Sequence, residues 1–212
     1  MIEAGGSAMG KVLATLLVAV MLTVGGGGIV RAGPLEDGVG AYKRGDYTTA
    51  LRILRPLADQ GSAEAQFWLG AMYEHGQGVA HDFREARHWL RLAAEQGNAL
   101  AQTFLGIAYG EGQGVIQDFQ EALKWTRLAA EQGQAAAQLY LGFMYEEGIG
   151  VAQDYQHAYM WSDIAASKHG DDAILRAINQ RDRIAKHLTA AQRVLAQQMA
   201  RQCEASSFKN CE

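Results

Sequence analysis

The sequence predicts an all-α protein, an α-solenoid of about five antiparallel helix pairs. Three observations predict this fold class: a unit of 36 residues recurs along the chain, apolar residues in each unit follow helical spacing, and glycines separate the helices at fixed places. With 212 residues, of which 49% are hydrophobic, the chain is long and apolar enough to bury a core. Its 25 glycines are many for a helical protein, and the repeat accounts for them.

The repeated unit starts at Ala65, Ala101 and Ala137, which are 36 residues apart. A degenerate half-repeat or cap is expected before it, at 33–61, because stepping back 36 residues from Asp82 reaches Asp46. We expect the repeats over 62–172 and divergent capping helices over 173–212. The matching positions include Gln66/Gln102/Gln138, Leu69/Leu105/Leu141, Gly70/Gly106/Gly142, Tyr73/Tyr109/Tyr145, Gly76/Gly112/Gly148, Gly78/Gly114/Gly150, Asp82/Asp118/Asp154 and Trp89/Trp125/Trp161.

Each unit is expected to form two helices, each with one apolar stripe. In the first helix, Ala65, Leu69 and Tyr73 recur every four residues. In the second helix, Trp89 lies three residues after one alanine and four before another, and Asp82 is placed to cap the helix start. A single pair cannot bury its stripes, so neighbouring units must stack and share a core that contains the three matching tryptophans.

The glycines are expected to have two structural roles. Gly70, Gly106 and Gly142 lie inside a helix, where glycine costs about 1 kcal/mol relative to alanine, so a close approach of the partner helix is the expected compensation. The Gly-X-Gly-Val stretches that begin at residues 76, 112 and 148 predict the turns between helices. A phosphate-binding loop is disfavoured, because no strand precedes these turns and they recur in every unit.

Residues 1–32 resemble a signal peptide. An uncharged apolar run covers Val12 to Val24 and is followed by glycines and by Val-Arg-Ala, which predicts cleavage after Ala32. Glu3 is unusual before such a run, so Met9 is an alternative start. We expect an exported, periplasmic protein without a membrane span after cleavage, and an N-terminal membrane anchor is the alternative, because Val12 to Val30 carries no charge.

Cys203 and Cys211 are the only cysteines, and in an oxidising compartment they predict one disulfide.

The net charge of -4 argues against a nucleic-acid partner. The charge is uneven, because acidic residues dominate 36–172 and basic residues dominate 173–212. The basic tail is favoured as a soluble capping element, with contact to an anionic partner as the alternative. Its arginines and lysine are Arg176, Arg181, Arg183, Lys186, Arg193 and Arg201.

The motif Ala-x-Ala-Gln-x-x-Leu-Gly-x-x-Tyr-x-x-Gly-x-Gly-Val-x-x-Asp-x-x-x-Ala-x-x-Trp-x-x-x-Ala-Ala resembles the Sel1-like repeat, a relative of the tetratricopeptide repeat. The resemblance covers about Leu35 to Ala173 and implies a right-handed superhelix that holds a protein or peptide partner. A cysteine-rich branch of that family has been associated with penicillin binding and β-lactam hydrolysis. That branch carries cysteine pairs in its repeats, and this sequence has none there.

If the first helix of each pair lines the concave side, as the resemblance implies, the positions off its apolar stripe form the expected binding groove. One row places an aromatic residue at the same position of three units, which is typical of binding hot spots, although these rings are equally expected to pack between repeats. The predicted groove residues are Phe67, Trp68, Ala71, Glu74, His75, Phe104, Ile107, Glu111, Tyr140, Phe143 and Glu147, with Glu64, Thr103, Gly110, Leu139 and Glu146 beside them.

No catalytic or cofactor-binding constellation is recognised in the sequence. His75, His81 and His88 lack the spacing that places two metal ligands together, and surface histidines are favoured. The carboxylate pair Glu146 and Glu147 points apart on a helix, which does not suit acid and base work at one point. We therefore predict a non-enzymatic scaffold of the bacterial cell envelope without metal or cofactor, and a β-lactam or cell-wall hydrolase is the alternative. The partner and the oligomeric state do not follow from the sequence.

Overall fold

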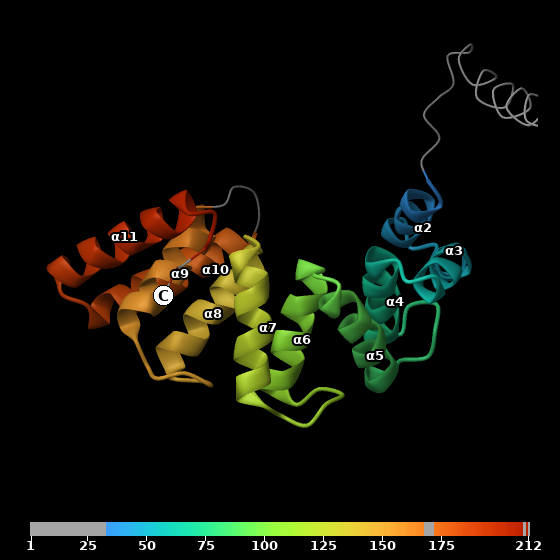
Figure 1. Ribbon diagram of the computed structural model, residues 1–212, viewed down its shortest axis with the longest axis horizontal. Helices are drawn as coiled ribbons and strands as arrows, with labels where there is room; N and C mark the ends of the chain where they lie inside the picture. The colour runs from blue at the N-terminus through green and yellow to red at the C-terminus, as the bar shows by residue number, and fades with distance from the viewer. Residues whose placement is uncertain (1–32, 168–171, 210, 212) are drawn as a thin grey trace, which may run out of the picture. The chain divides into compact units, whose positions relative to one another are not determined.

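The computed structural model describes residues 33–167, 172–209 and 211, and this part of the chain is helical without strands (Figure 1). The predicted signal peptide lies outside the described residues. Within them, no helix is both long and apolar enough to cross a membrane. The helices are α2 (Pro34–Lys43), α3 (Tyr47–Asp59), α4 (Ala63–His75), α5 (Phe83–Glu95), α6 (Ala99–Glu111), α7 (Phe119–Glu131), α8 (Ala135–Glu147), α9 (Tyr155–Ser167), α10 (Asp172–Ile184), the 3-10 helix η1 (Ala185–His187) and α11 (Ala190–Ala205).

The helices from α2 to α9 form four antiparallel pairs, and each pair packs on the next (Figure 1). We call α2, α4, α6 and α8 the first helices and α3, α5, α7 and α9 the second helices. Residues 33–61, for which the sequence predicts a cap, contain the complete pair of α2 and α3. The all-α solenoid predicted from the repeat is confirmed.

Local capping explains where the helices begin and end. Asp82 and Asp118 precede α5 and α7, and their carboxylates accept hydrogen bonds from the backbone N–H groups two and three residues further on. Gly76, Gly112 and Gly148 end α4, α6 and α8 with φ angles of 64°, 72° and 72°, a left-handed conformation that suits glycine. The sequence therefore fixes helix length locally, before any unit contacts its neighbour.

The glycines inside the first helices lie against the second helix of their own pair. A Cβ atom added to Gly70 would lie 2.7 Å from Cγ of Leu90, and one added to Gly142 would lie 2.8 Å from Oγ of Ser162. Gly106 faces Thr126 in the same way. Larger residues at these positions would push the two helices apart, so the close approach offsets the low helix propensity of glycine.

The second glycine of each Gly-X-Gly turn has a different neighbour. Gly78, Gly114 and Gly150 have positive φ angles, and each lies against the residue that starts the second helix of the preceding unit. A Cβ atom on Gly114 would lie 2.6 Å from the carbonyl oxygen of Phe83, and one on Gly150 would contact the carbonyl of Phe119. The turns therefore contribute to stacking between units as well as to chain reversal.

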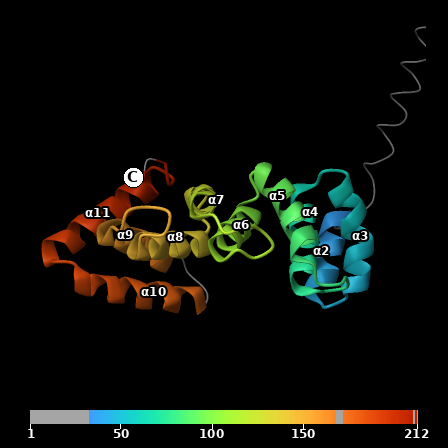
Figure 2. The same cartoon turned by 90° about the horizontal axis from the view of Figure 1, so that it is seen from below.

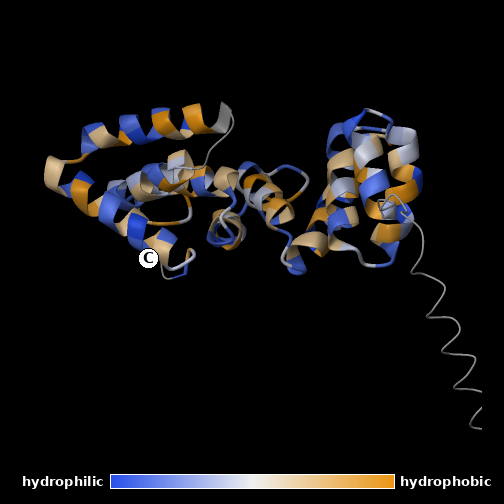
Figure 3. Ribbon diagram, turned by 90° about the horizontal axis from the view of Figure 1, so that it is seen from above, coloured by the Kyte–Doolittle hydropathy of each residue, from blue (hydrophilic) through white to orange (hydrophobic). Residues whose placement is uncertain are grey.

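The core follows the repeat. Trp89, Trp125 and Trp161 are only 7%, 6% and 0% exposed. The buried apolar residues form two clusters, one with Trp89 and one with Trp125 and Trp161. Trp68 of α4 is partly buried and packs against both clusters, so apolar contact continues from one cluster to the other. Figure 3 shows the corresponding alternation of hydrophobic and hydrophilic residues along the helices.

Buried amides set the spacing between units. The Nε2 groups of Gln66, Gln102 and Gln138 each donate a hydrogen bond of 3.1 Å to a carbonyl oxygen near the end of the preceding second helix. All three glutamines are buried, at 4%, 4% and 0% exposure, so each unmade bond would leave a desolvated amide. The recurrence of glutamine every 36 residues in this chain therefore has a direct structural cause.

The tail continues the register of the first helices into α10. Arg55 donates to the hydroxyl of Tyr73, 18 residues later, and Arg91 and Arg127 donate in the same way to Tyr109 and Tyr145. One unit further on, the pair is Asp163 of α9 and Arg181 of α10, at 3.2 Å. Arg181 thus occupies the tyrosine position of a first helix.

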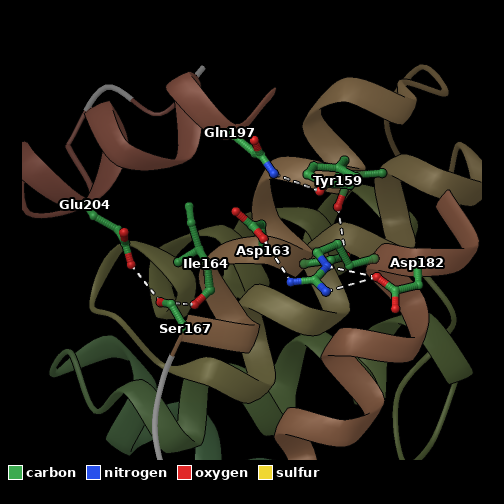
Figure 4. Close-up of polar contacts among 10 residues, drawn as sticks. Tyr159, Asp163, Ile164, Ser167, Asp182, Gln197 and Glu204 are labelled. Carbon is green, nitrogen blue, oxygen red and sulfur yellow. Dashed lines mark hydrogen bonds and ion pairs between the residues drawn. The ribbon is translucent and has the colours of Figure 1, made fainter. Parts of the chain in front are cut away.

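The last two helices pack differently from a repeat pair. The predicted divergence takes this form: α10 packs against α8 and α9, and α11 packs against the other side of α9, so that α9 lies between α10 and α11 (Figure 2). Polar contacts from α9 hold both helices (Figure 4): Asp163 accepts from Arg181, Tyr159 accepts from Gln197 at 3.3 Å, and Ser167 donates to Glu204 at 2.8 Å.

The start and end of α11 agree with the sequence. The sequence Thr189-Ala-Ala-Gln192 has the pattern of a capping box, and the structure forms it: the Thr189 side chain accepts from the backbone of Gln192, and the Gln192 side chain accepts from the backbone of Thr189. At the other end, Cys203 and Cys211 form the predicted disulfide, with Cα atoms 4.8 Å apart. The disulfide ties the C-terminal turn back onto α11.

Candidate binding site on the first helices

The predicted aromatic row lies on the first helices and packs between units. Trp68 contacts Tyr42 of α2, with ring centroids 4.7 Å apart, and Phe104 contacts Phe67 of α4 at 5.7 Å. The Tyr140 hydroxyl occupies the space that a side chain on Gly110 of α6 would need. Each ring of the row therefore leans on the preceding first helix and remains partly exposed.

A pocket of about 570 Å³ opens where this row reaches α8. It lies between α6, α8 and α10 and brings together residues up to 76 positions apart in the sequence. Three of the predicted groove residues, together with the neighbouring Leu139, line it. The apolar wall consists of Ile107, Ala136, Leu139, Tyr140 and Phe143, and the polar wall consists of Arg176, Asn179, Gln180 and Arg183.

The apolar wall is organised by two rings of α8. Tyr140 and Phe143 are stacked, with centroids 6.1 Å apart and planes 21° apart. Burial raises the pKa of the Tyr140 hydroxyl, and the charge of Glu111 raises it further. The hydroxyl is therefore protonated at neutral pH and remains a hydrogen-bond donor at the rim of an apolar surface.

The polar wall comes from one face of α10. Its four residues follow the i, i+3, i+4, i+7 spacing of a single helix face. Gln180 is buried, and its Nε2 donates to the backbone carbonyl of Leu139 at 3.4 Å, which joins the two walls. Arg176 and Asn179 are exposed.

Arg183 is fixed by a carboxylate. Its Nε and Nη2 donate to the two oxygens of Glu146 at 2.7 Å and 2.6 Å, and Glu146 is only 6% exposed. These hydrogen bonds raise the pKa of Arg183 above its ordinary value, so it is charged throughout the physiological range. Glu146 therefore neutralises Arg183, whereas Arg176 is exposed and forms no ion pair with another described side chain.

The family model of the Sel1 repeat matches residues 29–62, 63–98, 99–134 and 135–169. The chain belongs to the Sel1 repeat family. The match confirms the resemblance that the repeated motif predicts. Sel1 repeats generally mediate protein–protein interaction, which agrees with the expected class of function.

Two solved structures resemble this Sel1 repeat protein. One is a protective antigen present in uropathogenic Escherichia coli strains, with an SLR fold: it is 33% identical, the TM-score is 0.69, and the match covers 82% of this chain and 42% of the antigen. The other is a Sel1 repeat protein from Oxalobacter formigenes: it is 31% identical, the TM-score is 0.64, and the match covers 84% and 76% of the two chains. This chain thus spans less than half of the antigen. No curated protein matches it.

The other predicted groove residues lie in three environments. Phe67 and Ala71 are 5% and 4% exposed and belong to the core, so we leave them out of the binding surface. Glu74 of α4 forms a largely buried ion pair with Arg87 of α5, whose pKa is lowered to about 10 by burial. His75, Glu111 and Glu147 are exposed, and Thr103 is buried with its hydroxyl bonded to the Ala99 carbonyl.

The polar wall is not among the predicted groove residues, although Arg176 and Arg183 belong to the basic tail for which contact with an anionic partner is the alternative expectation. The predicted row Trp68, Phe104 and Tyr140 reaches Arg176 after another 36 residues. Asn179 likewise lies 36 residues after Phe143, and Arg183 lies 36 residues after Glu147. Extending the repeat beyond its recognisable motif would therefore have named three of the four polar residues.

His81 and His88 each pack against a neighbouring aromatic ring and do not lie together in a cluster of metal ligands. His81 lies edge-on to Phe83 and His88 lies edge-on to Trp89, with ring centroids 4.2 Å and 5.2 Å apart. Over the part of the chain that the structure describes, no three histidine, cysteine or carboxylate side chains gather in a way that would hold a metal ion.

Proposed function

We propose that this Sel1 repeat protein is a non-catalytic scaffold of the bacterial cell envelope that binds a protein or peptide partner along its first helices. The observation that carries this proposal is the pocket between α6, α8 and α10, in which Ile107, Tyr140 and Phe143 meet arginines from the tail. Aromatic residues and arginine are the side chains that contribute most binding energy at protein interfaces.

The rest of the first-helix face supports an extended partner. Trp68, Phe104 and Tyr140 repeat at the spacing of the units and are partly exposed. A surface that repeats one kind of contact from unit to unit suits a peptide or a helix that runs across several repeats. The hydrolase alternative has no support from the family match or from the two similar structures.

A crosslinking experiment in the native host tests the binding face. A photoreactive phenylalanine analogue at Ile107 or at Leu139 is expected to crosslink the same partner, because both residues line the pocket. Matched controls place the analogue at His88 and Lys124, which are exposed on the second helices. Equal crosslinking from both sets, or none from the pocket positions of the folded protein, would contradict a partner on the first helices.

Export to the envelope is the second part of the proposal. The apolar run of residues 12–24 and the disulfide between Cys203 and Cys211 support it, because disulfides persist in oxidising compartments. Mass spectrometry of the intact protein from the periplasmic fraction is expected to give a chain that starts at Gly33. A cytosolic chain that retains residues 1–32 would contradict both export and cleavage.

A further inference from the structure

The pocket at the C-terminal end of the first-helix face combines an apolar wall with the exposed arginine Arg176. We propose that it binds an acidic peptide segment of the partner: an apolar side chain of that segment fills the pocket, and Arg176 pairs with an aspartate or glutamate carboxylate next to it. This inference rests on the proposed scaffold function and adds the chemistry of the partner.

The size and lining of the pocket favour an apolar side chain. Its volume of about 570 Å³ exceeds what one ordered water needs and lies in the range of binding pockets. Leu139, Tyr140 and Phe143 line the pocket and are partly exposed, so they present apolar surface to it. Burying an apolar side chain against these residues removes exposed apolar surface on both partners, which favours binding.

The charge of the pocket favours a carboxylate. The charged residues in and beside it include Arg176 and Arg183 of α10, Glu146 and Glu147 of α8, and Glu111 near Tyr140. Glu146 accepts two hydrogen bonds from Arg183 and is buried, so it cannot also neutralise Arg176. Arg176 and Asn179 are exposed one turn apart on α10, and their side chains make no hydrogen bond to another described side chain, so their side-chain N–H groups can donate to a ligand.

The change of residue type along the repeat supports the same assignment. The row that carries Trp68, Phe104 and Tyr140 ends in Arg176, and the row that carries His75, Glu111 and Glu147 ends in Arg183. Acidic residues dominate 36–172, whereas basic residues dominate 173–212, the part of the chain that supplies the polar wall. The acidic body of the chain therefore disfavours a negatively charged segment, and Arg176 of α10 offers such a segment an attractive contact at this pocket.

The test is selection from a random heptapeptide library displayed on phage, against the folded, disulfide-bonded chain from residue 33. The wild type is expected to enrich peptides with a Leu, Ile, Met or aromatic residue next to Asp or Glu. The Arg176→Glu variant is expected to bind these peptides about tenfold or more weakly, because a charge-assisted hydrogen bond is replaced by repulsion. Arg176 is exposed, so this variant keeps its fold, which circular dichroism checks.

Arg201→Glu is the matched control, because Arg201 is an exposed arginine of α11 outside the pocket. The Arg201→Glu variant is expected to bind the enriched peptides with the affinity of the wild type. Phe143→Gln reports on the apolar wall and is expected to weaken the same peptides. Enriched peptides without a carboxylate, or equal binding to Arg176→Glu and wild type, would overturn this inference and leave the scaffold function standing. Failure of the folded wild type to enrich any peptide would count against the scaffold function itself.

Discussion

Arg183 donates two hydrogen bonds to Glu146, from Nε at 2.7 Å and from Nη2 at 2.6 Å, and so ties α10 to α8. Glu146 is 6% exposed, whereas the side chain of Arg183 is 56% exposed. The carboxylate therefore depends on this partner for its burial, because few water molecules reach it. One wall of the pocket is held to the other through this pair.

Replacing Arg183 with alanine is expected to lower the free energy of unfolding by about 1 to 3 kcal/mol, since it leaves a buried carboxylate unpaired. The lower part of this range applies because solvent screens the exposed guanidinium. Urea unfolding followed by circular dichroism measures the change. Arg201→Ala, an exposed arginine on α11, is expected to stay within about 0.5 kcal/mol of wild type. A second substitution, Glu146→Gln, is expected to restore part of the loss, and equal effects of the two arginine variants would contradict this reading.

Gly150→Ala tests the contact between a turn and the preceding unit. Gly150 has a φ angle of 68°, and an added Cβ would lie 2.9 Å from the carbonyl carbon of Phe119. The control is Gly97→Ala, because Gly97 has a φ of 87° and no atom within 4 Å of the added Cβ. Gly97→Ala is expected to cost about 1 to 2 kcal/mol from backbone strain alone.

The Gly150→Ala variant is expected to cost about 1 to 3 kcal/mol more than Gly97→Ala, because the clash with backbone adds to the strain. The difference between the two unfolding free energies, measured by urea denaturation, isolates the contact between units. If both variants lose the same stability, the turn does not contribute to stacking.

Trp161→Ala is expected to destabilise the protein by about 3 to 5 kcal/mol, because Trp161 is fully buried at 0% exposure and its removal leaves a cavity. Thermal and urea unfolding measure the loss. Trp161→Phe keeps part of the ring volume and is expected to lose less stability. This variant tests the prediction if the alanine variant does not fold. Leu128→Ala is the surface control, since Leu128 is 39% exposed, and an equal loss there would show that Trp161 is not a core residue.

Asp154 provides a pH-dependent contribution at the start of α9. Burial raises the pKa of its carboxyl group, but hydrogen bonds from His157 and Gln156 outweigh this effect and hold the pKa below the usual value of 3.8. A carboxyl group with a lowered pKa in the folded state stabilises the protein above the unfolded pKa and loses this effect as the pH falls through the folded pKa. The contribution is therefore complete at neutral pH and disappears below about pH 4.

Asp154→Asn retains a capping oxygen and removes the charge, so it separates the two effects. We expect the variant to be less stable than wild type at pH 7, and we expect the difference to shrink as the pH falls below about 4. Unfolding free energies measured from pH 7 to pH 3 give the comparison. A difference that stays constant over this range would show that the charge of Asp154 contributes nothing.

Much of the fold could be predicted because it is determined locally. The spacing of Gly70, Gly106 and Gly142 and the caps at Asp82 and Asp118 specify helix ends and close pairs within a single unit. The 36-residue period then specifies that the units stack. The candidate site was only half predictable: Ile107, Tyr140 and Phe143 follow from the repeat, whereas Arg176 and Asn179 lie in a tail whose motif has diverged.

The sequence by itself determined the helix pairs of the repeats, the capping box at Thr189 and the disulfide, because these depend on neighbouring residues or on a strict repeat. Only the tertiary structure decided that α9 lies between α10 and α11, and that α10 faces α8 across a pocket. The physical reason is that the tail can bury its apolar residues in more than one way. The choice depends on contacts such as that between Glu146 and Arg183, 37 residues apart, which no local pattern encodes.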